Sequence, residues 1–459
     1  MMPTFPARQG LRAGLRYPGS RISPVTIAAT PATALAPDAT DAFVRRHLRH
    51  NLLALGMDFG FFMVALSFAG QSTILPAFAA HLGAPNVVIG AIPALMTIGW
   101  YLPPLFVAGY TQSLARKLPF VVRYTIWERA PYLVLAAAAF TLAVPAPGLT
   151  LVLLLAMLLV IAGTGGVLMP AWMDVVAGAI PTTLRGRFFA FAGVGASVAG
   201  LGAGLVTAWL LAAVPAPRSY GLCFLLCALF MAVSYAALTS VRERPVPAGP
   251  SDLSMRGQLR RVPAILRGDA NLAWYLAARA CASVGTMAGG FYTVYAIIVL
   301  GAPAWQAGVF TTFMIAGKIV GDLALGWVAD HLGHRLVLIT GVVATVAGNA
   351  LALLSPSIET LGVVFALLGV HFAANNVSGL NVLLEFAPSA AERPTYIGLG
   401  LTTVAPLAFA APILAGLVAD AWGFRAVFAA AGLFGLTALA LLLARVRDPR
   451  HLVETPLGG

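Results

Sequence analysis

The stretch LTLVLLLAMLLVIAGTGGVLMPAWM, residues 149–173, decides the fold class of this chain. No charged side chain interrupts it before Asp174, and a bilayer span needs only about 20 apolar residues. The whole chain has the same character, since 60% of its 459 residues are apolar, 10% are charged and the mean hydropathy is +0.89. A soluble domain needs more charge than this to cover its surface. The composition therefore excludes a soluble enzyme, a disordered chain and a nucleic-acid binder, and predicts a polytopic membrane protein.

Apolar runs separated by glycine, proline or arginine extend this prediction in both directions. They predict membrane helices over 51–78, 87–110, 119–144, 149–180, 187–214, 219–240, 271–300, 304–328, 335–354, 358–387, 395–419 and 425–445. The predicted domains are a disordered basic tail (1–48), an N-terminal six-helix bundle (49–241), a linker (242–269), a C-terminal six-helix bundle (270–446) and a second tail (447–459). The expected fold class is an all-α membrane protein with twelve transmembrane helices in two pseudo-symmetric bundles.

The basic residues predict how these helices cross the membrane. The net charge is +12, and with the N-terminus inside, nearly all arginines and lysines of the loops fall on the cytoplasmic side. The opposite side keeps only Arg218 and Arg425. Because positive loop residues favour the cytoplasm, we expect a multi-pass protein of the cytoplasmic (inner) membrane with both termini in the cytoplasm.

The two halves also repeat. The triplet Gly83-Ala84-Pro85 precedes the second predicted helix, and Gly301-Ala302-Pro303 precedes the eighth, at an offset of 218 residues. The same offset carries Gly99 onto Gly317. Two parallel six-helix repeats with a site at their interface are a transporter architecture.

A loop motif between the eighth and ninth predicted helices carries a family resemblance. The segment GWVADHLGHR, residues 326–335, resembles the loop signature of the major facilitator superfamily, with Asp330, Gly333 and Arg335 at matching positions. The run Arg185-Gly186-Arg187 looks like the Arg-Gly-Arg loop of that family. The resemblance covers residues 45–447, and it implies the twelve-helix fold and a secondary active transporter that works by alternating access.

The first half departs from the pattern. At the equivalent spacing stand Ala108, Gln112, Ser113, Ala115, Arg116 and Lys117, so the aspartate and both glycines are missing. The fifth predicted helix also lacks the Gly-Pro pair of the antiporter signature of that family. This absence disfavours drug–proton antiport as the function. Its glycines are interpreted as positions of close helix packing.

Ionisable and polar residues inside predicted spans are candidates for the substrate and proton pathway. A charge at the bilayer centre costs about 2.5–3.5 kcal/mol on insertion scales, so it usually has a function or a partner. The candidates are Asp58, Glu128, Arg279, Lys318, Asp322, His371 and Asn375. Each has a structural alternative: Lys318 and Asp322 are four apart and can simply neutralise each other, Arg279 can reach the membrane surface, and His371 and Asn375 can be polar packing residues.

The two acids of the N-terminal half leave several interpretations open. Asp58 has no base within one turn of its own helix, so it must be protonated, hydrated by a cavity or paired with another helix. Glu128 is followed by Arg129, but adjacent side chains on a helix diverge, so we expect its partner on another helix. Protonation of Asp58 would suit a proton-coupled carrier.

A second set of charges lies at the predicted cytoplasmic helix ends. Carboxylates and guanidinium groups there are expected to pair when the cytoplasmic side closes and to separate when it opens. These predicted latch residues are Asp174, Arg185, Arg187, Asp330, Arg335, Glu385 and Arg393. The alternative is a set of static surface ion pairs, each worth under about 1 kcal/mol.

The sequence thus predicts a proton-coupled transporter of a small solute, embedded in the lipid bilayer as a monomer. We expect no cofactor, no metal, no nucleic-acid partner and no enzymatic activity. An intramembrane enzyme would need a nucleophile–base pair or a metal cluster at membrane depth, and no such set stands out. A membrane sensor without transport is a further alternative.

Overall fold

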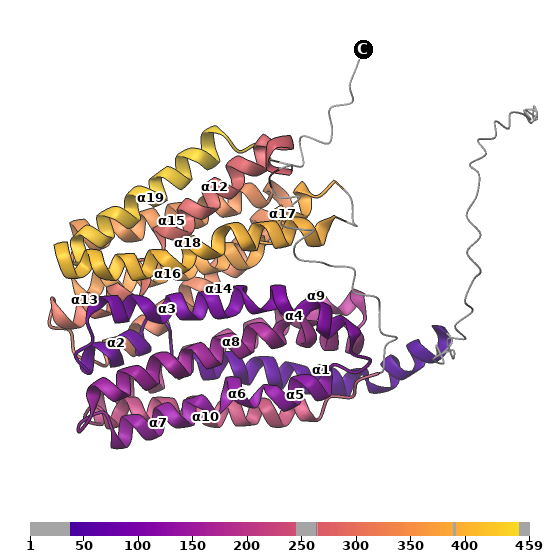
Figure 1. Ribbon diagram of the computed structural model, residues 1–459, viewed down its shortest axis with the longest axis horizontal. Coiled ribbons are helices and arrows are strands. Elements are labelled where there is room, and N and C mark those ends of the chain that lie inside the picture. The colour runs from indigo at the N-terminus through magenta and orange to yellow at the C-terminus, as the bar shows by residue number, and fades with distance from the viewer. Residues whose placement is uncertain (1–36, 245–262, 264, 389–391, 449–459) are drawn as a thin grey trace, which may run out of the picture.

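The computed structural model describes residues 37–244, 263, 265–388 and 392–448, and these ranges contain helices, turns and loops without a strand. Figure 1 shows the helices packed side by side in two bundles, one from each half of the chain. The predicted all-α fold class is confirmed.

The described part of the N-terminal bundle contains ten helical segments. They are α1 (Pro37–Phe68), α2 (Ile74–His81), α3 (Asn86–Tyr101), α4 (Pro103–Ser113), α5 (Leu118–Tyr124), α6 (Ile126–Arg129), α7 (Pro131–Thr141), α8 (Pro147–Ala179), α9 (Thr182–Ala213) and α10 (Arg218–Thr239). The C-terminal bundle contains α12 (Ala270–Gly285), α13 (Gly289–Ile298), α14 (Gln306–Leu332), α15 (His334–Leu354), α16 (Ile358–Ser378), α17 (Asn381–Phe386), α18 (Arg393–Trp422) and α19 (Phe424–Ala444).

Each of the twelve predicted spans corresponds to one pass of the chain along a bundle, but not every pass is one helix. Ten helical stretches of the described chain are long and apolar enough to cross a membrane. Two of these stretches contain two helices each, α12 with α13 and α16 with α17. The second and the third passes are not among the ten, because each is divided into shorter helices. Pro103 and Pro104 follow the end of α3, and Pro131 begins α7. Proline lacks the N–H that continues a helix, which accounts for the breaks between α3 and α4 and between α6 and α7. The break between α5 and α6 lies at Thr125.

The first helix starts earlier than the sequence predicted. We expected a disordered tail up to residue 48, but α1 begins at Pro37. A proline at the first position followed by acidic residues is a typical helix start, and the apolar run that follows prolongs the helix into the membrane. The remainder of the predicted tail, 1–36, and residues 449–459 lie outside the described chain, as does most of the predicted linker.

The bundles have two distinct ends, which we call the linker end and the far end. At the linker end α1 begins, α10 ends, α12 begins and α19 ends, and at the far end lies the short helix pair α2 and α13 (Figure 1). Gly83 and Gly301 mark equivalent far-end turns, with φ of 76° and 68°. Glycine adopts such angles without a steric penalty, and the repeated triplet therefore has the same backbone in both halves.

The apolar core is shared between the bundles only at the far end of the described chain. The largest buried cluster contains Phe68, Ile74 and Phe78 from the N-terminal bundle together with Phe291 and Phe310 from the C-terminal bundle. The three smaller clusters lie nearer the linker end, and each draws its buried residues from a single bundle. We call the first cluster the shared core.

Three sets of hydrogen bonds join the bundles among the described residues, and all three lie at the far end. Thr73 and Thr311 bond through their hydroxyl oxygens at 2.7 Å, and the Thr293 hydroxyl donates to the carbonyl oxygen of Ser72 at 2.9 Å. In the third set the carboxylate of Asp420 accepts from the amide side chain of Asn86 at 2.8 Å and from two backbone N–H groups at the start of α3.

Glycines let the bundle backbones touch next to these bonds. A Cβ on Gly90 of α3 would overlap with the carbonyl oxygen of Pro412 in α18, and one on Gly308 of α14 would overlap with the backbone of Ala208 in α9. The bundles thus contact each other at the far end through the shared core, whereas the clusters nearer the linker end each lie within one bundle.

Candidate functional site

Asp58 lies at the centre of a buried polar cluster in the N-terminal bundle. Its side chain is 3% exposed and receives hydrogen bonds from three other helices. Arg129 Nη2 donates to Oδ1 at 2.9 Å, the Ser234 hydroxyl donates to Oδ1 at 2.7 Å, and Trp172 Nε1 donates to Oδ2 at 2.9 Å. Of the three states that the sequence left open for Asp58, the geometry matches the pairing with another helix.

Arg129 also contacts Glu128, which corrects the prediction that these neighbours diverge. Arg129 Nη1 lies 3.5 Å from Glu128 Oε2, and the Thr125 hydroxyl donates to the same oxygen at 3.2 Å. The reason is local: both residues belong to the four-residue helix α6, which ends just before Pro131. A helix of only four residues does not fix neighbouring side chains in the diverging directions that they have on a long regular helix.

Charge balance is the main electrostatic property of the cluster. Asp58, Glu128 and Arg129 are all buried, and with both carboxyl groups ionised they sum to one negative charge. An unbalanced charge at this depth is expensive, and binding of one proton would make the cluster neutral. We call Asp58, Glu128, Arg129, Trp172 and Ser234 the N-bundle charge cluster.

A cavity of about 130 Å³ adjoins this cluster. It is lined by both acids and Arg129, and by the rings of Phe59, Phe62, Trp100 and Trp172. The Nε of Arg129 is buried and has no hydrogen-bond acceptor among the described residues. Buried donors are normally satisfied, so this N–H is an exception within the cluster.

Gly165 of α8 makes room for Glu128. A Cβ at this position would lie 2.6 Å from Glu128 Oε1, which is closer than a carbon and an oxygen can approach without a shift. The absence of a side chain at Gly165 therefore lets the Glu128 carboxylate lie against α8.

The C-terminal bundle contains a polar cluster of its own, made of three predicted residues. His371 Nδ1 lies 2.8 Å from the Thr345 hydroxyl and 3.1 Å from the carbonyl oxygen of Gly341, and Asn375 Nδ2 lies 2.8 Å from His371 Nε2. Arg279 lines the same small cavity, about 30 Å³ in volume, and donates to the carbonyl oxygen of Gly379.

Lys318 and Asp322 form an ion pair on one face of α14, as their spacing predicted. Their side chains are about one third exposed, and Asn376 Nδ2 lies 3.5 Å from Asp322 Oδ1. They lie on the same helix as Gly308 and Gly317, which make close contacts with neighbouring helices. The pair does not join either of the two clusters.

Two of the predicted latch acids lie near basic side chains that were not in the predicted set. Asp174 lies 3.6 Å from Lys117, and Glu385 lies 3.8 Å from His334 Nε2. Each pair stays within one bundle. Asp330 is exposed on the last turn of α14, and the side chain of Arg393 lies outside the described residues. A latch between the bundles at the linker end stays a prediction.

The arginines of the predicted latch bond to backbone instead. Arg185 donates to the carbonyl oxygens of Ile180 and Ala177 at the end of α8, and Arg335 donates to the last carbonyl groups of α19. Cations at helix C-termini are favoured by the helix dipole and by the unpaired carbonyls there. Arg187 is exposed and lies beside an apolar groove between α1 and α9.

Sequence reasoning missed three members of the N-bundle charge cluster. Ser234 is a lone serine in the apolar run of α10, Trp172 stands in the apolar run 149–173, and Arg129 precedes Ala130 and a proline. The sequence feature that could have indicated the cluster was Arg129, because it is a cation next to an acid inside a predicted span. Its pairing with Asp58 across 71 residues has no sequence signature.

Comparison with known proteins agrees with the fold. A family model described as Major Facilitator Superfamily matches residues 299–459, which include the loop motif 326–335. The structure of a mutant of the nucleoside transporter NupG covers 86% of the chain and 99% of its own with a TM-score of 0.64 at 14% identity. The xylose transporter XylE from E. coli, in a partially occluded inward open conformation, covers 87% and 99% with a TM-score of 0.61 at 12% identity.

The family model covers the last third of the chain, and the solved structures extend the likeness in fold to most of it. A bacterial homolog of the human lysosomal transporter Spinster, in an inward-facing and occupied conformation, has a TM-score of 0.61 at 15% identity and covers 86% of the chain and 96% of its own. The likenesses to these solved structures are to the fold, since all three identities are below 25%.

Curated relatives match over a shorter part. The multidrug resistance protein Stp of Mycobacterium tuberculosis (strain CDC 1551 / Oshkosh) is 29% identical over 132 residues, which are 29% of this chain and 25% of the relative. Solute carrier family 22 member 2 of Homo sapiens is 26% identical over 117 residues, 24% of this chain and 21% of the relative. The matches thus span about a quarter or less of the curated relatives.

Proposed function

We propose that the protein is a secondary active transporter that moves a small solute across the cytoplasmic membrane by alternating access, with proton coupling at the N-bundle charge cluster. The observation that carries this proposal is the set of two buried acids and one buried arginine beside a cavity, which sums to one negative charge when both carboxyl groups are ionised. The superfamily fold and the transporter names of its structural neighbours support the broader part of it.

The end-to-end asymmetry of the bundles supports alternating access. The far end is closed by the shared core and by three sets of inter-bundle hydrogen bonds in the described chain. The clusters nearer the linker end lie within single bundles. A rocking motion that opens the far end and closes the linker end would expose the site to the other side of the membrane.

Proton coupling follows from the charge count of the cluster. In one step of the cycle a proton binds a carboxyl group and removes the unbalanced charge, and in another step it leaves. A change of charge at a group that bonds to α6, α8 and α10 at once alters the free energy of each arrangement of these helices. Differential stabilisation of two states is what a coupling ion must supply.

Asp58→Asn tests this proposal because asparagine has the size of aspartate but leaves Glu128 and Arg129 as a neutral pair. The variant is expected to keep solute binding and counterflow while it loses accumulation driven by a pH gradient. A thermal-shift screen of the purified protein across metabolite classes first identifies a solute, and uptake into proteoliposomes with and without a pH gradient then measures coupling.

Glu359→Gln is the matched control, since it removes an exposed acid in the first turn of α16 and is expected to leave gradient-driven accumulation intact. Accumulation by Asp58→Asn at the wild-type level would assign Asp58 a purely structural role. Absence of any transported solute across the metabolite classes would favour the sensor alternative.

The proposed orientation puts both termini and the linker in the cytoplasm. Reporter fusions at Gly83, Pro147 and Ser357 are then expected to give signals of the outer side, and a fusion at Ser251 a signal of the inner side. The physical reason is the concentration of arginines at the linker end. A cytoplasmic signal at any of the first three positions would contradict this topology.

A further inference from the structure

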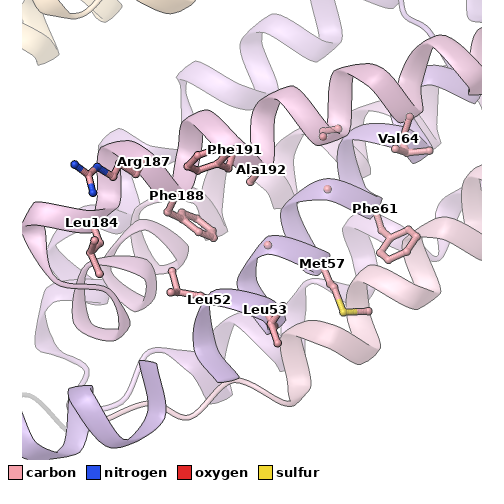
Figure 2. A pocket seen from close by; sticks show the side chains of 15 residues that line it. Leu52, Leu53, Met57, Phe61, Val64, Leu184, Arg187, Phe188, Phe191 and Ala192 are labelled. Carbon is pink, nitrogen blue, oxygen red and sulfur yellow. The ribbon is translucent and has the colours of Figure 1, made fainter. Parts of the chain in front are cut away.

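An apolar groove runs along the outside of the N-terminal bundle between α1 and α9 (Figure 2). It has a volume of about 650 Å³. Its floor is hollowed by small residues, and larger apolar side chains form its sides. The small residues are Gly56, Gly60, Ala192, Gly195, Ala196 and Ala199. The groove is several times larger than the cavity at the N-bundle charge cluster, and the transport proposal does not use it.

The groove faces away from the interior of the bundle. On α9, Phe189 packs against Phe59 and Trp172 on the inner side, whereas Phe191 is 78% exposed at the side of the groove. On α1, Asp58 points inward to its cluster, whereas Leu53 is 69% exposed. In a protein that spans a membrane, an outward apolar surface in the spans contacts the lipid acyl chains.

One charged side chain lies among the described residues that line the groove, and it lies at one end. Arg187 is in the second turn of α9, near the linker end, and Figure 2 shows its guanidinium pointing away from the apolar lining. No hydrogen bond or ion pair joins it to another residue in the part of the chain that the structure describes. The side chain of Arg185, two residues earlier, is already used by the carbonyl groups of α8.

The groove has the length of one membrane leaflet. It extends along α1 from Leu52 to Val64, which at 1.5 Å per residue is about 18 Å. Half of the roughly 30 Å hydrocarbon core of a bilayer is about 15 Å. A ligand with a long apolar chain and one negative charge at its end therefore matches the groove in length, polarity and charge.

We propose that this groove is a binding site for an anionic phospholipid of the leaflet at the linker end, with one acyl chain between α1 and α9 and its phosphate on Arg187. Guanidinium groups bind phosphate by charge-assisted hydrogen bonds. The small residues admit the chain close to both helices, where it contacts the back of α1 opposite the N-bundle charge cluster.

Lipid titration followed by native mass spectrometry of the purified protein tests the site. Phosphatidylglycerol is expected to bind the wild-type protein roughly tenfold or more tightly than phosphatidylcholine, the scale of one hydrogen bond to a charged group. Arg187→Gln is expected to lose this preference and to bind both lipids alike. The matched control is Arg123→Gln, which removes an exposed arginine outside the groove. This variant is expected to keep the preference for phosphatidylglycerol.

Two further variants test the acyl chain. Gly195→Leu and Gly60→Leu fill the groove from opposite helices, and neither added Cβ meets a heavy atom within 4 Å. Both are expected to weaken retention of phosphatidylglycerol roughly tenfold or more, since each removes the space of a buried chain segment. Gly202→Leu is the matched control on α9, because it is equally open but outside the groove.

The results separate the proposal from its alternatives. A wild-type protein that binds the two lipids equally, or an Arg187→Gln variant that keeps its preference, would overturn the headgroup assignment. Phosphatidylglycerol retention by Gly195→Leu and Gly60→Leu at the level of Gly202→Leu would overturn the groove as the site. Neither readout depends on transport, so failure here leaves the proposed function untouched.

Discussion

Arg129→Gln is expected to lower the free energy of unfolding by about 3–5 kcal/mol, the range found when one partner of a buried ion pair is removed. The arginine is the only cation of the N-bundle charge cluster as defined by its described residues, and it bonds to Asp58 and lies 3.5 Å from Glu128. Without it, two carboxyl groups remain buried beside each other. Thermal unfolding of the purified protein in detergent measures the loss.

The matched control is Arg123→Gln, which removes an exposed arginine of the same pass and is expected to change stability by less than about 0.5 kcal/mol. Adding Asp58→Asn to Arg129→Gln is expected to restore part of the stability, because it removes one of the two uncompensated carboxylates. Contacting residues show coupling energies of about 0.5–3 kcal/mol in such cycles. Strictly additive effects of the two changes would show that the observed ion pair does not stabilise the fold.

Gly90→Leu is expected to open the far end in most molecules. A Cβ on Gly90 overlaps with the carbonyl of Pro412 and comes within 3.2 Å of Ile413 Cα, and since these atoms are backbone, no side-chain rotation relieves the overlap. The helices α3 and α18 therefore have to separate. Spin labels at Gln71 and Ser355, at the far end of the two bundles, are expected to report a longer distance by pulsed electron paramagnetic resonance.

Gly148→Leu controls for the mere addition of a leucine at this end, because its Cβ meets nothing within 4 Å, and the label distance is expected to stay unchanged. Labels go into a protein without its native cysteines. An unaltered distance in Gly90→Leu, in a sample that unfolds like the wild-type protein, would refute the idea that the α3–α18 glycine contact holds the far end closed.

The sequence predicted the passes of the fold well because the membrane imposes a strong length and composition rule. Each pass of the chain needs a run of apolar residues, and such runs are visible without any tertiary information. Breaks inside passes were harder to predict. Proline tolerates a membrane span or divides it according to its neighbours, so Pro93 lies inside α3 while Pro103 separates α3 from α4.

The candidate site was predicted in part, for a reason that its residues make plain. Asp58 and Glu128 stand out because an acid inside a membrane span is energetically costly, and an acid within an apolar run is visible in the sequence. The hydrogen-bond partners of Asp58 could not be predicted in this way. Trp172, Ser234 and Arg129 reach Asp58 from three other helices, and the relative rotation of these helices is set by packing that no local pattern records.

The arginines at the linker end illustrate a competing use of charge. The sequence predicted that Arg185 and Arg335 pair with carboxylates, but both donate to helix-terminal carbonyl groups instead. A helix end offers several unpaired carbonyl acceptors at one place. Arg185 uses those of the preceding helix, and Arg335 uses those of α19, 107 residues away in the sequence.

The shared core has a thermal consequence. Opening the far end would expose to a water-filled cavity the apolar side chains that now join the bundles, among them Phe291 and Phe310. The free energy gained by burying such surface decreases on cooling, with a large heat-capacity change as its signature. In the proposed transport cycle, temperature therefore contributes to the balance between the two access states. Warming toward physiological conditions is expected to favour the closed far end, and cooling is expected to bring the open form closer in free energy.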